Sequence, residues 1–197
     1  MNTSKRKVKQ RRKSSLRFWI VATFLLSIIY VWLQQKGDSY DIWPRTNVQE
    51  ALPITGLHPV VAESEKLLVR KAARRGIEIV ITHDFRSIEE QDALYNQGRS
   101  IAGNIVTNAK GGESYHNYGL AIDFALQTPE GDVVWDMERD DNGNGKADWL
   151  EVVELAKELG FTWGGDWANF PDYPHLQMDF GLSINDLKRG KRPPDTQ

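Results

Sequence analysis

The sequence predicts an α+β domain with a small, mostly antiparallel sheet and flanking helices, preceded by one N-terminal transmembrane helix. Apolar residues recur at helical spacing in several segments and alternate with polar residues in several shorter ones. The strand-like segments are joined mainly by hairpin-sized connections, and the chain shows no regular strand–helix–strand repeat. Helices and strands mixed without that repeat are typical of the α+β class.

Length and charge limit the functions open to this chain. Its 197 residues allow one domain plus an appendage, and the absence of cysteine excludes disulfides, thiolate zinc sites, cysteine nucleophiles and a lipoprotein anchor. The net charge of −2 conceals a segregation, because residues 1–17 hold eight Lys or Arg and no acidic residue. Beyond them, the other 17 of the 25 basic residues face 27 acidic ones, which argues against nucleic-acid binding.

The N-terminus carries an uncharged apolar segment at 18–33 behind the basic residues 1–17. As a helix it reaches about 24 Å, and aromatic residues lie near both of its ends, where the membrane interface favours them. We expect a transmembrane signal anchor with a basic cytoplasmic tail at 1–17 and a linker at 34–56, so that the remainder lies outside the cell membrane. A cleaved signal peptide and a buried core helix are the alternatives.

The first predicted elements of the main domain are a helix at 59–75 and a strand at 76–82. Apolar residues recur at helical spacing in the first segment, Pro59 suits a first turn, and Gly76 is a typical helix end. In the second segment Ile77, Ile79 and Ile81 alternate with other residues, which gives a strand with one apolar face. The pair is predicted to form the first helix and first strand of the domain.

A second helix is predicted at 88–97. Ser87 followed by Glu90 forms a capping box at its start, and Gly98 ends it. Residues 99–113 are rich in Gly and Asn and are expected to form a long loop.

The second half of the chain is predicted to hold the remaining strands and one more helix. Each strand-like segment alternates apolar with polar or small residues, and the helix ends at a glycine. The predicted elements are strands at 119–126, 133–135 and 174–180, a helix at 150–159, a turn-rich aromatic segment at 161–167, and a basic tail at 183–197.

Two of these segments carry residues typical of a metal site. His116 and Asp123 lie around the start of one strand, and His175 lies on the polar face of another. Two imidazoles and a carboxylate suit a catalytic zinc ion, which keeps its fourth position for water. Asp172 precedes His175 by three residues and is a candidate general base, and Arg86 follows a buried strand as a candidate for oxyanion stabilisation.

Four other residues near these candidates bear on the site. Gly119 and Ala121 share a strand face with Asp123, and their small size is predicted to let metal and substrate approach. His83 lies close in sequence to the candidate arginine and is predicted to line the site, whereas His58 is predicted to be structural. Taken singly, each candidate is also compatible with a surface or structural role, so spacing alone leaves the metal site undecided.

The segment Ser114-x-His116-x-x-Gly119-x-Ala121-x-Asp123 resembles the SxHxxGxAxD signature of the LAS zinc peptidases. Phe85-Arg86-Ser87 with Glu90-Gln91 resembles the family's arginine segment, and Trp163-Gly-Gly-Asp-Trp167 with Asp172-x-Pro-His175 resembles its L-alanyl-D-glutamate subgroup. The resemblance covers residues 57–182. Two positions depart from the family pattern: Asp172 stands where relatives often have Glu, and His83 where they usually have a small residue.

The resemblance implies a hedgehog/D,D-peptidase-like fold and a role for each matched residue. His116, Asp123 and His175 would bind zinc, Asp172 would act as general base, and Arg86 would stabilise the scissile carbonyl oxygen or hold a substrate carboxylate. The residues expected on the substrate side are Ser114, Gln91 and Asp166.

The activity implied by the resemblance is hydrolysis of the L-Ala–D-Glu amide in the stem peptide of peptidoglycan, outside the membrane. One alternative is a D-alanyl-D-alanine carboxypeptidase of the same fold, and another is a non-catalytic wall-binding domain. The expected partners are peptidoglycan stem peptides and, through the N-terminal helix, the membrane; no protein partner is inferred.

Residues 140–151 match the loop of a calcium-binding EF-hand. Side chains or backbone carbonyls at the usual ligand positions are present, and a glycine occupies the sixth position. The candidate calcium ligands are Asp140, Asn142, Asn144, Lys146 (through its backbone carbonyl), Asp148 and Glu151. The alternative is an Asn/Gly/Asp-rich turn that binds nothing. If calcium binds, we expect it to order the catalytic domain.

Overall fold

The computed structural model describes residues 53–194. The predicted basic tail at 1–17, the predicted membrane span at 18–33 and most of the predicted linker at 34–56 lie outside these residues. Within 53–194, no helix combines the length and apolarity needed to cross a membrane.

Three of the four α-helices begin and end within two residues of their predicted bounds. Pro59 occupies the first turn of α2, and the His58 side chain accepts a hydrogen bond from the backbone N–H of Val60. Ser87 and Glu90 form the reciprocal capping box of α3. The α-helices are α2 (Pro59–Arg74), α3 (Ile88–Asn96), α4 (Asp148–Glu158) and α5 (Ile184–Lys188).

The strands form one antiparallel sheet in the order β1-β2-β5-β4, with β3 paired to the far end of β2. Two short 3₁₀ helices lie directly before β2 and directly after β4. The elements are β1 (Ile79–His83), η1 (Tyr115–Tyr118), β2 (Ala121–Gln127), β3 (Val133–Val134), β4 (Thr162–Trp163), η2 (Gly164–Asp166) and β5 (His175–Gln177). The predicted α+β class with a small antiparallel sheet is therefore confirmed.

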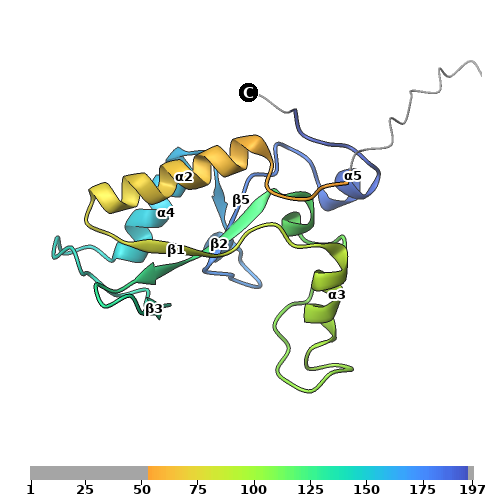
Figure 1. Cartoon of the computed structure of the whole chain (residues 1–197), viewed down its shortest axis with the longest axis horizontal. Helices are drawn as coiled ribbons and strands as arrows, with labels where there is room; N and C mark the ends of the chain where they lie inside the picture. Colours follow the sequence, from red (N-terminus) through yellow and green to blue (C-terminus); the bar gives the residue numbers. More distant parts are fainter. Residues whose placement is uncertain (1–52, 195–197) are drawn as a thin grey trace, which may run out of the picture. The chain divides into compact units, whose positions relative to one another are not determined.

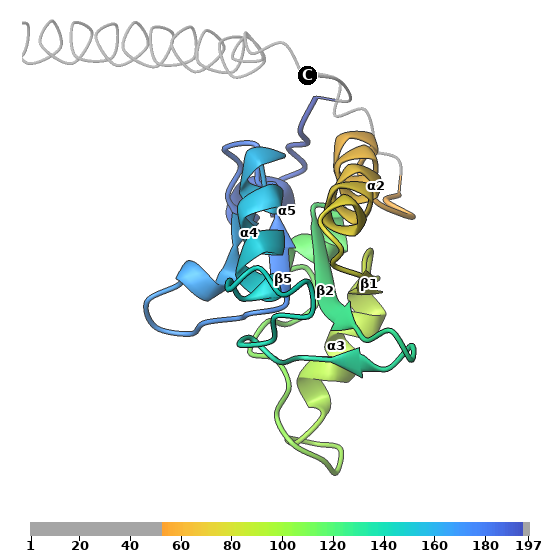
Figure 2. The same ribbon diagram turned by 90° about the vertical axis from the view of Figure 1, so that its left-hand side faces the viewer.

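The hydrophobic core lies between the sheet and the helices α2 and α4, which run side by side over one face (Figures 1 and 2). Phe124 of β2 and Trp149 of α4 are both fully buried, and their rings lie 4.5 Å apart. Because side chains alternate along a strand, Asp123 points to the opposite face of β2. Helix α3 and the loop after it extend away from the core (Figure 1).

Gly119 serves a different purpose from the one that the sequence indicates. It lies before β2, ends η1 in the left-handed region at φ +66, and a Cβ there would meet the backbone oxygen of Gly56 at 2.3 Å. Its small size therefore reflects a close approach of two backbones and a positive φ, not the approach of metal or substrate.

The C-terminal region contains a helix that the sequence pattern does not predict. Ser183 and Asp186 form the capping box of α5, and Leu187 is buried against the domain. The structured domain thus continues beyond 182, into the segment expected to be only a basic tail.

Candidate metal centre

Strand β2 supplies the central residue of the site, Asp123. In the sheet register Asp123 is paired with His175 of β5 on one side and with His83 of β1 on the other. The pairing with β1 shifts register between Ile81 and His83, and the Thr82 hydroxyl donates to the backbone oxygen of Asp123. Directly opposed residues in a sheet bring their side chains close together, so pairing alone assembles these three residues.

Helix η1 supplies His116. The Ser114 side chain accepts a hydrogen bond from the His116 backbone N–H, and Asn117 completes a capping box at the start of the helix. The left-handed Gly119 then turns the chain into β2. This short helix places His116 against the polar face of β2, where it is buried with 3% of its surface exposed.

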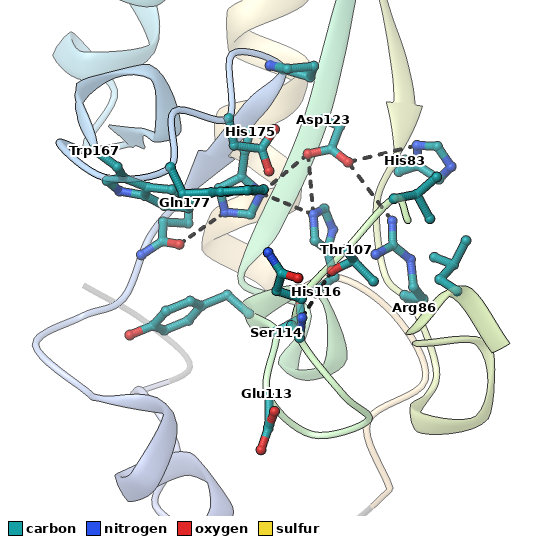
Figure 3. A pocket seen from close by; sticks show the side chains of 18 of the residues that line it. His83, Arg86, Thr107, Glu113, Ser114, His116, Asp123, Trp167, His175 and Gln177 are labelled. Atoms are coloured by element: carbon teal, nitrogen blue, oxygen red, sulfur yellow. Dashed lines mark hydrogen bonds and ion pairs between the residues drawn. The ribbon is translucent and has the colours of Figure 1, made fainter. Parts of the chain in front are cut away.

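Three ligand atoms converge at one point. His116 Nε2 and His175 Nδ1 each lie 3.3 Å from Asp123 Oδ1 and 3.2 Å from each other (Figure 3). Asp123 Oδ1 is buried and has no hydrogen-bond partner. Burying a carboxylate oxygen without a partner is unfavourable, which indicates that a cation belongs at this point.

The outer nitrogen of each histidine is held by a different part of the chain. His116 Nδ1 lies 2.6 Å from the backbone oxygen of Asp84, and His175 Nε2 lies 3.0 Å from Gln177 Oε1. Both acceptors are oxygens, so with a cation bound each outer nitrogen would donate its proton and each inner nitrogen would present its lone pair to the cation. This arrangement of outer hydrogen bonds is the one that orients metal-binding histidines.

The dimensions of this group match zinc. A tetrahedral zinc ion with ligand bonds of about 2.0–2.1 Å separates its ligand atoms by about 3.3 Å. The three observed separations of 3.2–3.3 Å agree with that value. His116, Asp123 and His175 are also the only group of three or more His, Asp or Glu within 53–194 whose ligand atoms converge in this way.

The electrostatics of the group follow from burial and proximity. Burial raises the pKa of the Asp123 carboxyl, but the adjacent imidazoles of His116 and His175 outweigh it and hold that pKa well below its usual range. Burial lowers the pKa of His175, but Asp123 outweighs it and leaves the pKa raised. Asp123 is therefore an ionised ligand at neutral pH.

Asp172 reaches the site through a tight turn, as the sequence predicts. The His175 backbone N–H donates to the backbone oxygen of Asp172 at 3.2 Å, and Asp172 lines the same cavity as the three ligands. A Cβ on Gly164 would lie 2.4 Å from that backbone oxygen, so only glycine allows the turn to pack here. Burial raises the pKa of the Asp172 carboxyl, with His175 opposing the shift and Asp123 adding to it.

Arg86 faces the second oxygen of the aspartate ligand. Its Nη2 lies 3.9 Å from Asp123 Oδ2, while His83 Nδ1 lies 3.8 Å from the same oxygen (Figure 3). Gln91 is fully buried and accepts a hydrogen bond of 2.9 Å from Arg86 Nη1. Gln91 does not line the cavity, and its hydrogen bond supports the arginine. A substrate contact of Gln91 stays a prediction.

The other two residues expected on the substrate side lie in different places. Ser114 lines the cavity that contains the ligands. Asp166 lies in η2, outside the lining of that cavity, and pairs with Lys157 at 2.6 Å. A substrate role for Asp166 stays a prediction.

Sequence reasoning missed two polar contacts of the site. It gives no role to Gln177 and none to the backbone oxygen of Asp84. The period-two pattern of β5 was a usable signal for Gln177, because it faces the same way as His175. Nothing in the local sequence identifies the carbonyl.

The EF-hand-like segment forms an ordered loop before α4. Asp140 accepts backbone N–H bonds from Asn144 and Gly145, and the side-chain amides of Asn142 and Asn144 both reach Glu151 Oε2. Gly145 adopts the positive φ of +82. The carboxylates of the loop do not converge as the histidine–aspartate group does, which leaves calcium binding a prediction.

Known proteins resemble this chain over the region that contains the site. A family model described as D-alanyl-D-alanine carboxypeptidase matches residues 107–178. A peptidoglycan L-alanyl-D-glutamate endopeptidase of Bacillus subtilis is 55% identical over 156 residues, which cover 79% of this chain and 90% of that protein. An L-alanyl-D-glutamate peptidase of Listeria phage A118 is 36% identical over 124 residues, which cover 61% of this chain and 38% of that protein.

Solved structures also match. The L-Ala D-Glu endopeptidase ChiX of Serratia marcescens is 25% identical, with a TM-score of 0.44 and coverage of 72% of this chain and 95% of that one. An L,D-carboxypeptidase, DacB, of Streptococcus pneumoniae is 20% identical, with a TM-score of 0.46 and coverage of 71% and 73%.

Proposed function

The chain belongs to the LAS-type zinc peptidases, in their L-alanyl-D-glutamate subgroup, and from that membership we propose that it hydrolyses the L-Ala–D-Glu amide of peptidoglycan stem peptides. It is a metallopeptidase acting on the cell wall. The observation that carries the proposal is the convergence of His116 Nε2, Asp123 Oδ1 and His175 Nδ1 at zinc-like separations. Asp172 and Arg86 line the same cavity.

His116, Asp123 and His175 are the residues that would hold the zinc ion. When bound there, zinc acts as a Lewis acid that polarises a carbonyl and acidifies water. The hydrogen bonds of the two histidines to Asp84 and Gln177 orient their inner nitrogens toward the place that the ion would occupy.

The remaining chemistry is assigned to residues of the cavity wall. The Asp172 carboxylate accepts the proton of the attacking water and then delivers it to the leaving nitrogen of D-Glu. Its raised pKa, caused first by burial, makes this carboxylate a stronger base than an exposed one. Arg86, fixed by Gln91, provides a cation beside the substrate for the developing oxyanion or for a substrate carboxylate.

Digestion of defined muropeptides by the full-length protein tests this assignment. We expect a disaccharide carrying only L-Ala as product, and Asp172→Ala is expected to retain zinc while losing activity by at least about 100-fold. Release of free D-Ala would instead identify a D,D-carboxypeptidase. Bound zinc with no turnover of any muropeptide would identify a non-catalytic wall-binding domain.

We also propose that residues 140–151 bind calcium. The match to the EF-hand ligand positions, the positive φ of Gly145 and the meeting of Asn142 and Asn144 at Glu151 support this proposal. Calcium would then stabilise the start of α4, where Trp149 packs against Phe124 of β2. The double variant Asp140→Ala, Glu151→Ala is expected to remove a calcium-dependent rise in thermal stability; a rise that persists in the variant would contradict the proposal.

For location, we propose a single-pass anchor in the cell membrane with the catalytic domain outside. The support is the polybasic segment 1–17 followed by the apolar segment 18–33. Membrane fractions are expected to retain the intact protein, and external protease is expected to digest the domain in protoplasts. A mature protein that begins after residue 33 would contradict the anchor and favour a cleaved signal.

A further inference from the structure

The cavity around the metal centre has an aromatic rim that the hydrolytic chemistry does not use. The cavity holds about 890 Å³, and Trp135, Trp167 and Phe170 are among the residues that line it. Their exposed fractions are 58%, 38% and 60%. Large apolar side chains left open to solvent beside a catalytic centre are typical of a surface that a ligand covers.

The two sides of the metal centre differ in chemistry. Arg86 and His83 lie on one side of Asp123, whereas Trp167 and Gln177 lie beyond His175 on the other (Figure 3). The Trp167 ring packs against the imidazole of His175 with ring centroids 5.2 Å apart. Phe170 belongs to the same segment, between η2 and β5. One side of the cavity is therefore cationic and the other is aromatic.

The proposed substrate has the same asymmetry about its scissile bond. On the D-Glu side it carries an α-carboxylate, which the cationic side suits by charge. On the other side a single L-Ala joins the scissile carbonyl to the lactyl group of N-acetylmuramic acid. L-Ala and the lactyl group each span at most about 3.6 Å, so the sugar ring must lie within about 7 Å of the scissile carbonyl.

We propose that Trp167 and Phe170 form a subsite for the N-acetylmuramyl sugar that bears the stem peptide. This inference rests on the proposed L-Ala–D-Glu endopeptidase function and assigns the direction in which the substrate lies. The C–H face of a pyranose ring stacks on an aromatic ring and covers its apolar surface. The subsite makes the enzyme selective for peptides still attached to glycan.

The inference is tested with two substrates that differ only in the sugar: a disaccharide-tetrapeptide and the free tetrapeptide. We expect the wild-type, full-length protein to favour the sugar-bearing substrate by about tenfold in kcat/KM. Phe170→Ala is expected to reduce that ratio to about threefold or less, and Phe170→Trp is expected to retain it. Ile88→Ala, at an exposed apolar position on α3 outside the cavity lining, is the matched control and should keep the wild-type ratio.

Each outcome decides the question. A wild-type ratio near one overturns the subsite, because the sugar then adds nothing to transition-state binding. A wild-type preference that survives in Phe170→Ala and in Trp167→Ala places the sugar elsewhere and also overturns it. Hydrolysis of neither substrate by the zinc-loaded wild type would overturn the proposed endopeptidase function itself.

Discussion

At the scale of single residues, the metal centre depends on which nitrogen of each histidine carries the proton. His116 presents Nε2 to Asp123, whereas His175 presents Nδ1. The difference follows from the acceptors at the outer nitrogens, a backbone oxygen for His116 and the Gln177 amide for His175. The two histidines therefore require different neighbours to do the same task.

Arg86 depends on a buried neighbour in the same way, which leads to a prediction for Gln91. Replacing Gln91 with Leu leaves the Arg86 guanidinium and the Ala109 backbone oxygen without their present partner. We expect the unfolding free energy to fall by about 1–3 kcal/mol and kcat/KM to fall about tenfold or more as Arg86 loses its position. Zinc content should stay stoichiometric.

Steady-state kinetics with metal analysis and urea unfolding check this prediction. Gln127→Leu, on the same sheet but outside the cavity lining, is a matched control that should leave kcat/KM unchanged. Full activity in Gln91→Leu would show that Arg86 needs no such support.

At the scale of elements, the site is a product of sheet register and two tight turns. Central β2 places Asp123 between β1 and β5, η1 folds His116 onto it, and the turn before β5 brings in Asp172. Each of these elements is short, so the site depends on contacts between them more than on the stability of any one.

A substitution at Gly164 tests how strongly the site depends on the turn that carries Asp172. Gly164→Ala would place its Cβ 2.4 Å from the Asp172 backbone oxygen and 3.1 Å from His175 Cβ, so the turn must shift. We expect about tenfold weaker zinc binding and a larger loss of kcat, because both a ligand and the base move. Zinc competition with a chelator and muropeptide kinetics measure the two effects. Gly56→Ala, where no atom lies within 4 Å of the added Cβ, is the control for the methyl group without crowding.

Helix α5 provides a pH-dependent test of how the C-terminal segment docks. Lys191 and Ser183 lower the pKa of the Asp186 carboxyl. A lowered pKa contributes stability above the unfolded value of about 3.9, and that contribution is lost as the pH falls toward the folded value. Asp186→Asn should therefore lower the urea midpoint at pH 7 and have a progressively smaller effect at pH 3 and pH 2.

Glu130→Gln removes one charge from an exposed turn and serves as the control for this series. Its effect on the urea midpoint should be near zero at pH 7. An Asp186→Asn effect that is equal at all three pH values would contradict the assigned ion pair and cap.

At the scale of the whole domain, the ligands tie together segments that are far apart in the chain. His116 lies on η1, Asp123 on β2 and His175 on β5. The stretch of chain between Asp123 and His175 contains the whole of α4. A metal that binds this folded arrangement and not the unfolded chain stabilises the fold by mass action.

Zinc removal should therefore lower the melting temperature. With zinc at about 1,000 times its Kd, the stabilisation is about 4 kcal/mol, which corresponds to a Tm shift of roughly 10 °C for a domain of this size. Calorimetry of the chelator-treated and zinc-loaded protein measures the shift. His175→Ala should abolish it, and an unchanged Tm in the wild type would contradict a zinc site made by these three residues.

Much of this architecture could be predicted because its signals are local. The capping box at Ser87, the helix start at Pro59 and the alternation along β2 each involve neighbours in sequence. Helices α2, α3 and α4 lie within two residues of their predicted ends. The zinc ligands were predicted from the spacing of His116 and Asp123 with the turn before His175, and resemblance to a family raised that prediction above its structural alternatives.

The sequence by itself determined the fold class, the approximate bounds of α2, α3 and α4, and the residue types able to bind zinc, because these follow from periodicity and from side-chain chemistry along short segments. Only the tertiary structure decided how those residues are used. It placed an oxygen acceptor at the outer nitrogen of each histidine and Gln91 against Arg86. It also brought Gly119 close to the Gly56 backbone and placed Phe170 in the lining of the cavity. The physical reason is that each of these outcomes is a contact between distant segments, and its partner is chosen by sheet register and packing.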